Sequence, residues 1–166
     1  MLEPSRARCD VLADWFQAEH RSLLRFAFLI SGDLATAEDL IQEAFVRIYR
    51  AGGRVDREGF PTYARRTVAN LGRSAFRRRM RERRITHDPG RLTAEDPAEL
   101  IRRDDLWKAV TALSPQQRAC VALRYYEDMT EQRIAEVLDV SVGTVTKQLT
   151  RALAKLRAAV GEEGRS

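Results

Sequence analysis

Four polar residues recur on one face of a helix predicted near the end of the chain. They lie in TEQRIAEVLDVSVGTVTKQLTRALAKL, residues 130–156, where two capped helices are separated by only three residues, the spacing of a helix-turn-helix. The second helix has an apolar stripe, and the four polar residues project from the opposite side: Thr144, Lys147, Gln148 and Arg151. Ser141 lies at the N-terminus of this helix. Lysine and arginine can reach guanine acceptors or phosphates, glutamine can pair with adenine, and a helix N-terminus can approach a phosphate. The segment predicts recognition of duplex DNA, with a solvated face on a small helical hairpin as the alternative.

A second segment, YARRTVANLGRSAFRRRMRERR, is strongly basic. Residues 65–84 hold nine arginines and one glutamate, a net charge of +8. No folded core absorbs that many guanidinium groups, so most of them must face water or phosphate. Tyr63 and Phe76 lie among the arginines, and Asn70 carries an amide that can read a base edge. Charge attracts a nucleic-acid backbone and rings replace lost base stacking, so the segment predicts contact with unpaired nucleic acid; a solvated face is the alternative.

A third segment, DLATAEDLIQEAFVRIYR, has the opposite character. At helical spacing, one stripe of this helix consists of three polar residues and a valine: Asp39, Gln42, Glu43 and Val46. Small and apolar residues lie on the opposite side. Such a face would repel DNA, and it suits a protein partner with a basic helical surface. On spacing alone, an ordinary exposed helix face is an equally good interpretation.

Helices must position all of these residues. Apolar residues recur at helical spacing almost throughout the chain and no segment reads convincingly as a strand, so we predict an all-α fold. Asp33 is expected to cap the helix that carries the acidic stripe, and Gly52 and Gly53 are expected to end it. A further helix is predicted from about Pro61 to Arg84.

A change in composition divides the chain in two. Residues 85–99 lose the periodicity and carry two prolines among acidic residues, which is typical of a solvated connector. We expect a helical domain over 1–84, a flexible linker over 85–99 and a helix-turn-helix domain over 100–166. The last domain should contain four shorter helices, beginning near Leu100, Pro115, Glu131 and Val142. Their predicted N-caps are Ser114, Thr130 and Ser141.

Composition narrows the classes of function. With 166 residues the chain has room for one ordinary domain or two small ones, which excludes a large multi-domain enzyme. A net charge of +5 and a pI near 9.7 permit a polyanionic partner. Cys9 and Cys120 lie far apart and His20 and His87 are isolated, so we expect reduced thiols, no metal site, no cofactor and no catalytic residue. No apolar run could span a membrane and the first residues lack a secretory signal, so we expect a cytoplasmic protein without a membrane partner.

Taken together, the three segments resemble the bacterial extracytoplasmic-function (ECF) sigma factors, small two-domain subunits that direct RNA polymerase to promoters. More narrowly, the chain is similar to their actinobacterial SigE-type branch, over about residues 12–160. AEDLIQEAFVRIYR, residues 37–50, resembles the family's core-binding segment. The resemblance implies that the stripe Asp39, Gln42, Glu43 and Val46 docks on the coiled coil of the polymerase's largest subunit.

The two basic segments match the family's DNA-reading parts. FPTYARRTVANLGRSAFRRR, residues 60–79, resembles the segment that melts and reads the minus-10 element, and AGGRVDREG before it matches the loop that captures a flipped base. This implies minus-10 contacts by Tyr63, Arg66, Asn70, Arg73, Arg77 and Arg78. Residues 113–157 resemble the domain that reads the minus-35 element. The contacts implied there are Ser141, Thr144, Lys147, Gln148 and Arg151.

The chain departs from the family pattern at a few positions. Tyr63 stands where the family often has Trp, and Ser74 where an acidic residue is common. The order Thr146-Lys147-Gln148 replaces a more usual basic-small-basic arrangement, so a promoter sequence is not carried over from the family. Asp139 replaces the frequent glycine of the turn, and because Asp tolerates positive φ better than most residues we expect the turn to persist.

The resulting hypothesis is a promoter-specificity subunit that has no chemistry of its own and binds the RNA polymerase core and promoter DNA. An anti-sigma factor is a further partner that the resemblance allows. The main alternative is a conventional helix-turn-helix regulator that acts without polymerase, but it leaves the arginine-rich helix unexplained. A nuclease is a second alternative, and it would need converging carboxylates or histidines that the basic segment does not supply.

Overall fold

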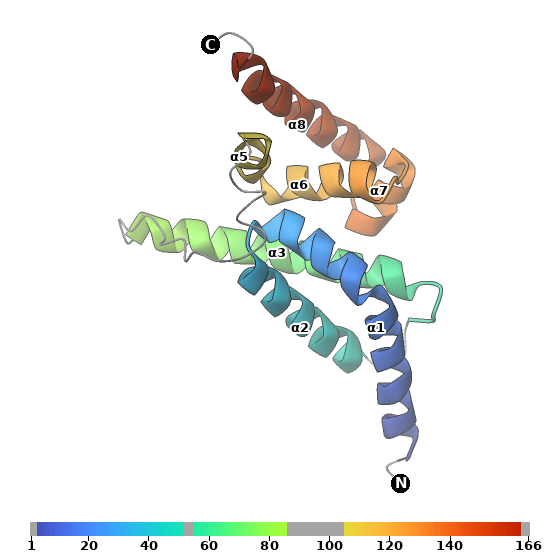
Figure 1. Ribbon diagram of the computed structural model, residues 1–166. Coiled ribbons are helices and arrows are strands. Elements are labelled where there is room, and N and C mark those ends of the chain that lie inside the picture. Colours follow the sequence, from blue (N-terminus) through green and yellow to red (C-terminus); the bar gives the residue numbers. More distant parts are fainter. Residues whose placement is uncertain (1–2, 52–54, 86–104, 164–166) are drawn as a thin grey trace.

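The chain folds into helices connected by short turns (Figure 1). The computed structural model describes residues 3–51, 55–85 and 105–163, and these ranges contain no strand, which confirms the all-α expectation. A short π-helix follows α6 directly. The elements are α1 (Glu3–Ser31), α2 (Leu34–Ala51), α3 (Phe60–Ile85), α5 (Asp105–Thr111), α6 (Pro115–Val121), η1 (Ala122–Tyr126), α7 (Glu131–Leu138) and α8 (Val142–Glu163).

The N-terminal half is a unit of three helices in which α1, α2 and α3 all contact one another. Each helix buries residues spaced three or four apart, as a helix with one apolar face must. The buried faces include Leu23, Phe26 and Ile30 of α1, Ala37, Leu40, Ile41, Ala44 and Ile48 of α2, and Phe60, Ala64 and Val68 of α3. Burial of one face of α2 leaves the opposite face, with the acidic stripe, in water.

The C-terminal half contains α5, α6, η1, α7 and α8, and α8 contacts α5, α6 and α7. Its core is built from Leu123, Ile134, Val137, Val145 and Leu149. Val142 has the helical spacing of the buried Val145 and Leu149, which predicts burial, but it is 40% exposed. Side chains of a helix tilt toward its N-terminus, and Val142 is the first residue of α8, so its side chain projects past the end of the helix.

The predicted helix starts are confirmed by their hydrogen bonds. The backbone N–H of Thr36 donates to Asp33 Oδ1 at 2.7 Å, which caps α2. Ser114 and Gln117 form a reciprocal capping box at the start of α6. The predicted caps Thr130 and Ser141 accept backbone N–H groups at 3.2 and 3.1 Å, respectively.

The boundary between the halves is only partly described. The expected end of α2 at Gly52 and Gly53 lies outside the described residues, as does the predicted linker apart from Ile85. The same is true of the helix start expected near Leu100, and the first described helix of the C-terminal half begins at Asp105.

The two halves pack against each other, which sequence patterns did not foresee. Helix α6 contacts α1 and α3, and α7 contacts α3. Figure 1 shows these C-terminal helices lying directly over α1 and α3. The rings of Phe28 and Trp107 stack across the boundary at 5.0 Å, and buried apolar residues of both halves join in one cluster. This packing decides which of the candidate contact residues remain accessible to a partner.

Candidate interaction surfaces

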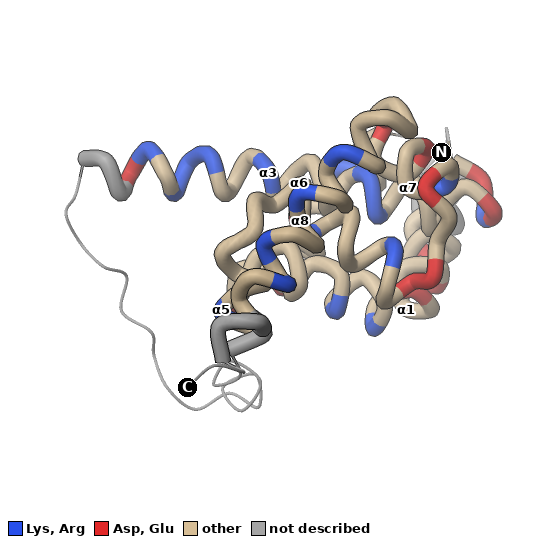
Figure 2. The backbone as a smooth tube through the Cα atoms, turned by 90° about the horizontal axis from the view of Figure 1, so that it is seen from above, with Lys and Arg blue, Asp and Glu red and all other residues tan. Residues whose placement is uncertain are grey.

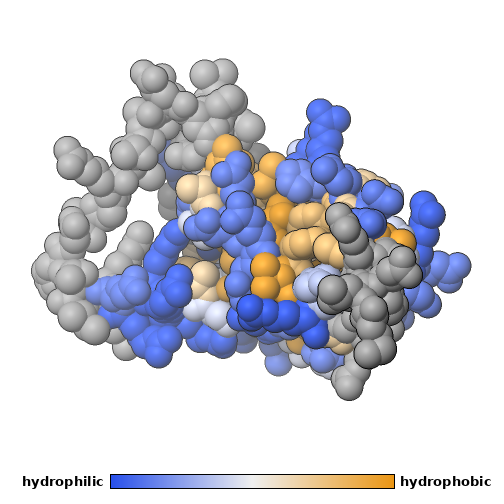
Figure 3. All heavy atoms as spheres, turned by 90° about the horizontal axis from the view of Figure 1, so that it is seen from below, coloured by the Kyte–Doolittle hydropathy of each residue, from blue (hydrophilic) through white to orange (hydrophobic). Residues whose placement is uncertain are grey.

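The acidic stripe on α2 is an exposed surface, as predicted. Asp39, Gln42, Glu43 and Val46 all lie on the solvent side, and the side chain of Val46 is 38% exposed. Sequence analysis missed Tyr49, which is 37% exposed and continues the spacing of Gln42 and Val46 along the helix. A view from below shows apolar atoms exposed between hydrophilic side chains on this side of the molecule (Figure 3). Acidic groups beside exposed apolar groups fit a protein partner better than DNA.

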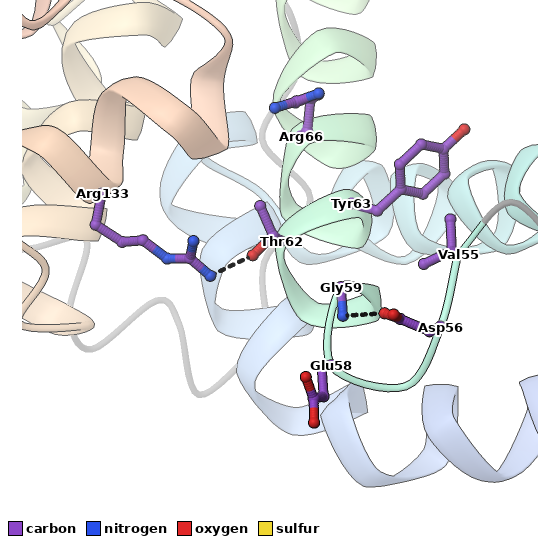
Figure 4. Close-up of a pocket in the computed structure, with 8 residues that line it drawn as sticks. All are labelled: Val55, Asp56, Glu58, Gly59, Thr62, Tyr63, Arg66 and Arg133. Carbon is purple, nitrogen blue, oxygen red and sulfur yellow. Dashed lines mark hydrogen bonds between the residues drawn. The ribbon is translucent and has the colours of Figure 1, made fainter.

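A hollow of about 420 Å³ lies beside the start of α3 (Figure 4). Its walls come from the segment before α3, from the first turns of α3 and from α7. The lining residues are Val55, Asp56, Glu58, Gly59, Thr62, Tyr63, Arg66 and Arg133. Asp56 shapes this segment because its Oδ1 accepts the backbone N–H of Gly59 at 2.7 Å. The hollow combines a planar ring, hydroxyls and two guanidinium groups, and it coincides with the loop expected to capture a base.

Helix α7 covers one side of this hollow. Arg133 donates from Nη2 to the hydroxyl of Thr62 at 2.6 Å. In the other direction, Arg66 donates from Nη2 to the carbonyl of Glu136 at 2.5 Å and from Nε to that of Val137 at 3.3 Å. Arg66 was expected to contact nucleic acid, and in this arrangement it binds the end of α7 instead.

Arg65 is a buried ion-pairing residue that sequence analysis did not separate from its basic neighbours. Its side chain is 7% exposed. The guanidinium pairs with Glu19 of α1 at 3.2 Å and with Glu127 of the C-terminal half at 2.8 Å. Its Nη2 also donates to the hydroxyl of Ser22 at 2.7 Å, and that hydroxyl donates to Glu127 at 2.8 Å. Nothing in the arginine-rich run distinguishes this residue, because its partners are distant in sequence.

The other residues of α3 that were expected to contact nucleic acid lie at least partly in solvent. Asn70, Arg77 and Arg78 are exposed and Arg73 is half-buried. The Oδ1 of Asn70 accepts a hydrogen bond from Arg73, which leaves its amide N–H groups to donate to a base edge. The C-terminal end of α3 extends beyond the rest of the molecule, and arginines recur along it (Figure 2). This extension is an open, positively charged helix suited to a polyanion.

The helix-turn-helix has the predicted geometry. Asp139 adopts φ 55°, so it ends α7 in the left-handed region as a glycine would. Ser141, Lys147 and Arg151 are exposed, and Thr144 and Gln148 are half-buried on the same side of α8. Helix α8 packs on α5, α6 and α7, and its polar face lies opposite the buried Val145 and Leu149. The polar face of α8 is therefore available in the same arrangement that covers Arg66.

Other kinds of site find little support in the described ranges. Nowhere in them do three or more His, Cys, Asp or Glu residues gather in a way that could hold a metal ion. None of the helices in these ranges is both long and apolar enough to cross a membrane. Cys9 and Cys120 are both free thiols.

Comparison with known protein families matches two segments of the chain to family models. Residues 15–82 match the model of sigma-70 region 2, and residues 103–156 match that of sigma-70 region 4. The chain is 34% identical over 146 residues to an RNA polymerase sigma-E factor of Streptomyces avermitilis, covering 87% of this chain and 82% of that protein. It is 36% identical over 141 residues to the ECF RNA polymerase sigma factor SigE of Mycolicibacterium smegmatis, covering 80% of this chain and 55% of that protein.

Two solved structures share the fold. The sigma factor RpoE of Bartonella quintana, solved with the anti-sigma factor NepR, aligns with a TM-score of 0.67 and 20% identity over 88% of this chain and 94% of that chain. CnrH, solved with the cytosolic domain of CnrY, aligns with a TM-score of 0.66 and 20% identity over 93% of this chain and 89% of that chain.

Proposed function

The chain belongs to the ECF family of RNA polymerase sigma factors, in its actinobacterial SigE-type branch, and from that premise we propose which of its surfaces bind polymerase and promoter. As a sigma factor it is a promoter-specificity subunit of RNA polymerase. The exposed acidic stripe on α2 is the observation that carries the assignment, because it is unsuited to DNA and is covered by no other described helix. Asp39, Gln42, Glu43 and Val46 form the polymerase-binding surface, and Tyr49 extends it.

The promoter contacts divide between the two halves. The exposed face of α8, with Ser141, Thr144, Lys147, Gln148 and Arg151, reads the minus-35 element as duplex DNA. The hollow beside Tyr63 and the basic face of α3, with Arg66, Asn70, Arg73, Arg77 and Arg78, hold the opened minus-10 element. We assign the first role to residues 100–166 and the second to residues 1–84.

The contacts between the halves support a closed form of the free chain. While the two carbonyls at the end of α7 hold its Nε and Nη2, Arg66 cannot present that edge of its guanidinium to a phosphate as a bidentate donor. Docking on polymerase must therefore separate α7 from α3 before the minus-10 surface is complete. Two modest DNA-binding surfaces on one chain also require a fixed distance between promoter elements, because joined sites gain effective concentration only when the spacing fits.

The remaining roles follow from the same assignment. The chain supplies recognition and strand opening in the cytoplasm, and the polymerase core supplies the catalysis. One of the two similar solved structures, that of RpoE, is a complex with an anti-sigma factor, and we propose a partner of that kind here. A conventional regulator that binds duplex DNA alone would not need the acidic stripe on α2.

Binding to purified core polymerase tests the assignment. We expect stoichiometric binding by the wild-type chain and loss of binding in Asp39→Arg and Glu43→Lys, because both place a cation on the proposed interface. Asp14→Lys, a charge reversal at an exposed position of α1, is the matched control and should bind normally. Run-off transcription on a genomic fragment library then identifies the promoter. Equal binding by all four proteins would refute the role of α2.

A further inference from the structure

Arg118 is a buried arginine at the boundary between the two halves. It lies on α6, is 5% exposed, and points toward the end of α1. Gly32 allows this approach, because it adopts φ 85° and an added Cβ there would lie only 3.3 Å from Arg118 Nη1. The guanidinium therefore sits between elements of both halves, where closing the molecule removes it from water.

This guanidinium has no carboxylate partner among the described residues. Its Nε is buried without a hydrogen bond, and no ion pair involving Arg118 is found there. Arg65, buried at the same boundary, contrasts with it by pairing with two carboxylates. Buried charges in proteins are normally paired, since removing one from water without compensation costs several kcal/mol.

A second guanidinium increases the positive charge at this point. Arg79 of α3 donates to Asp33 Oδ2 at 3.1 Å and also to the hydroxyl of Thr36. Burial, followed by the repulsion from Arg79, lowers the pKa of Arg118 to about 10. That value is still well above neutral pH, so Arg118 keeps its charge. Asp33 compensates Arg79, and the charge of Arg118 remains to be neutralised.

A small hollow adjoins both arginines. It measures about 20 Å³ and is lined by Arg118, Arg79, Ser31 and Thr36, with Ile30, Leu40, Gly72, Ala75 and Phe76 completing its walls. The threshold for holding one water molecule is roughly 10–15 Å³, so the space is large enough for one particle of about that size. The hydroxyl of Thr36 accepts a hydrogen bond from Arg79 and hydrogen-bonds to the carboxylate of Asp33, while Ser31 donates to the Asp33 carbonyl at 2.9 Å. The two guanidinium groups and the apolar walls suit a monatomic anion.

We propose that a single halide ion, chloride under ordinary conditions, binds in this hollow between Arg118 of the C-terminal half and Arg79 of the N-terminal half. The ion neutralises the buried guanidinium and is contacted from both sides of the boundary. Its binding therefore favours the closed arrangement of the chain. Because the site needs both halves in place, opening the molecule destroys it.

Thermal unfolding of the full chain tests the proposal when sodium chloride replaces sodium gluconate at constant ionic strength. A ligand that binds only the folded chain raises the midpoint as its concentration exceeds its dissociation constant. At tenfold excess we expect a rise of about 3–5 °C for a chain of this size. Broadening of the chloride NMR signal by the protein, reversed by bromide, provides a direct measure of binding.

The variants separate a specific site from general salt effects. Arg118→Met and Arg79→Met should each abolish the chloride-dependent rise and the line broadening. Arg79 is partly exposed, so its replacement keeps the proposal testable if Arg118→Met unfolds the chain. Arg157→Met, which removes an exposed arginine of α8, should behave as wild type. No chloride-specific rise in the wild type, or the same rise in all four proteins, would overturn the site.

Discussion

Arg65 of α3 and Glu127 of the C-terminal half form a 2.8 Å ion pair across the boundary between the two halves. The pair is largely removed from water, with side-chain exposures of 7% and 18%, and Ser22 connects to both partners. Helix α3 and the C-terminal half are thus tied together by the first basic residue of the run that was expected to contact nucleic acid. The closed arrangement rests on specific bonds as well as on apolar packing.

Removal of Glu127 should loosen the boundary. Glu127→Gln leaves the Arg65 guanidinium with Glu19 as its one carboxylate partner among those described, so we expect a loss of about 2 kcal/mol in unfolding free energy, less than the roughly 3–5 kcal/mol lost when a buried charge is left with no partner. Small-angle scattering should show an increased radius of gyration. The neighbouring Asp128 is exposed and has φ 51°, which asparagine tolerates, so Asp128→Asn is the control. Unchanged stability and dimensions in Glu127→Gln would show that apolar contacts alone hold the halves.

The face of α8 should determine affinity for duplex promoter DNA. Lys147→Ala and Arg151→Ala are each expected to weaken binding by about 1–3 kcal/mol where they contact a base edge. A residue that contacts only phosphate should instead reduce the slope of affinity against salt by about one. Fluorescence anisotropy with a labelled minus-35 duplex at several salt concentrations distinguishes the two. Arg157→Ala is the control, and equal losses in all three variants would indicate general charge attraction.

The cap of α2 should make stability depend on acidity. Burial opposes ionisation of Asp33, but hydrogen bonds from Thr36 and the charge of Arg79 outweigh it and lower the pKa of this carboxyl below 3.8. A lowered pKa stabilises the fold at higher pH, and this contribution disappears as the pH falls through the lowered value. Urea unfolding at pH 6 and near pH 3 should show a smaller acid-dependent loss in Asp33→Asn than in the wild type. Asp14→Asn should lose as much stability as the wild type.

The two thiols should differ sharply in reactivity. Burial and the nearby charge of Glu131 raise the pKa of Cys120 to about 11, so its reactive thiolate is scarce at neutral pH. Cys9 is only half-buried in α1. Iodoacetamide at pH 7.5 should label Cys9 in the folded chain and Cys120 only after denaturation, as followed by mass spectrometry. Rapid labelling of Cys120 in folded Cys9→Ala would mean that α6 opens readily.

Sequence patterns predicted the features that depend on neighbouring residues. The caps at Asp33, Ser114 and Ser141 follow from short side chains that bond the next turn of the backbone. The acidic stripe follows from helical periodicity, and the turn at Asp139 from the tolerance of Asp for positive φ. Each of these signals lies within a few residues of the feature it specifies.

The packing of the halves could not be predicted in this way. Arg65 and Arg66 are consecutive arginines in one basic run, yet one is buried in ion pairs and the other binds carbonyls of α7. Their partners in the C-terminal half, Glu127 and Glu136, lie 62 and 70 residues further along the chain. Arg118 likewise gave no local sign of burial, because the space around it is created by Gly32 and by helices of the other half. Contacts between distant segments leave no periodic trace.

The bonds from Arg66 to the carbonyls of Glu136 and Val137 set up a competition. In the proposed role of Arg66, closure of the chain and binding of opened DNA compete for the same edge of its guanidinium. Thermodynamic linkage then requires that any factor that stabilises the closed form lowers the affinity of the chain for opened DNA. Closure would in this way keep the free chain from binding melted regions of the chromosome before it has bound RNA polymerase.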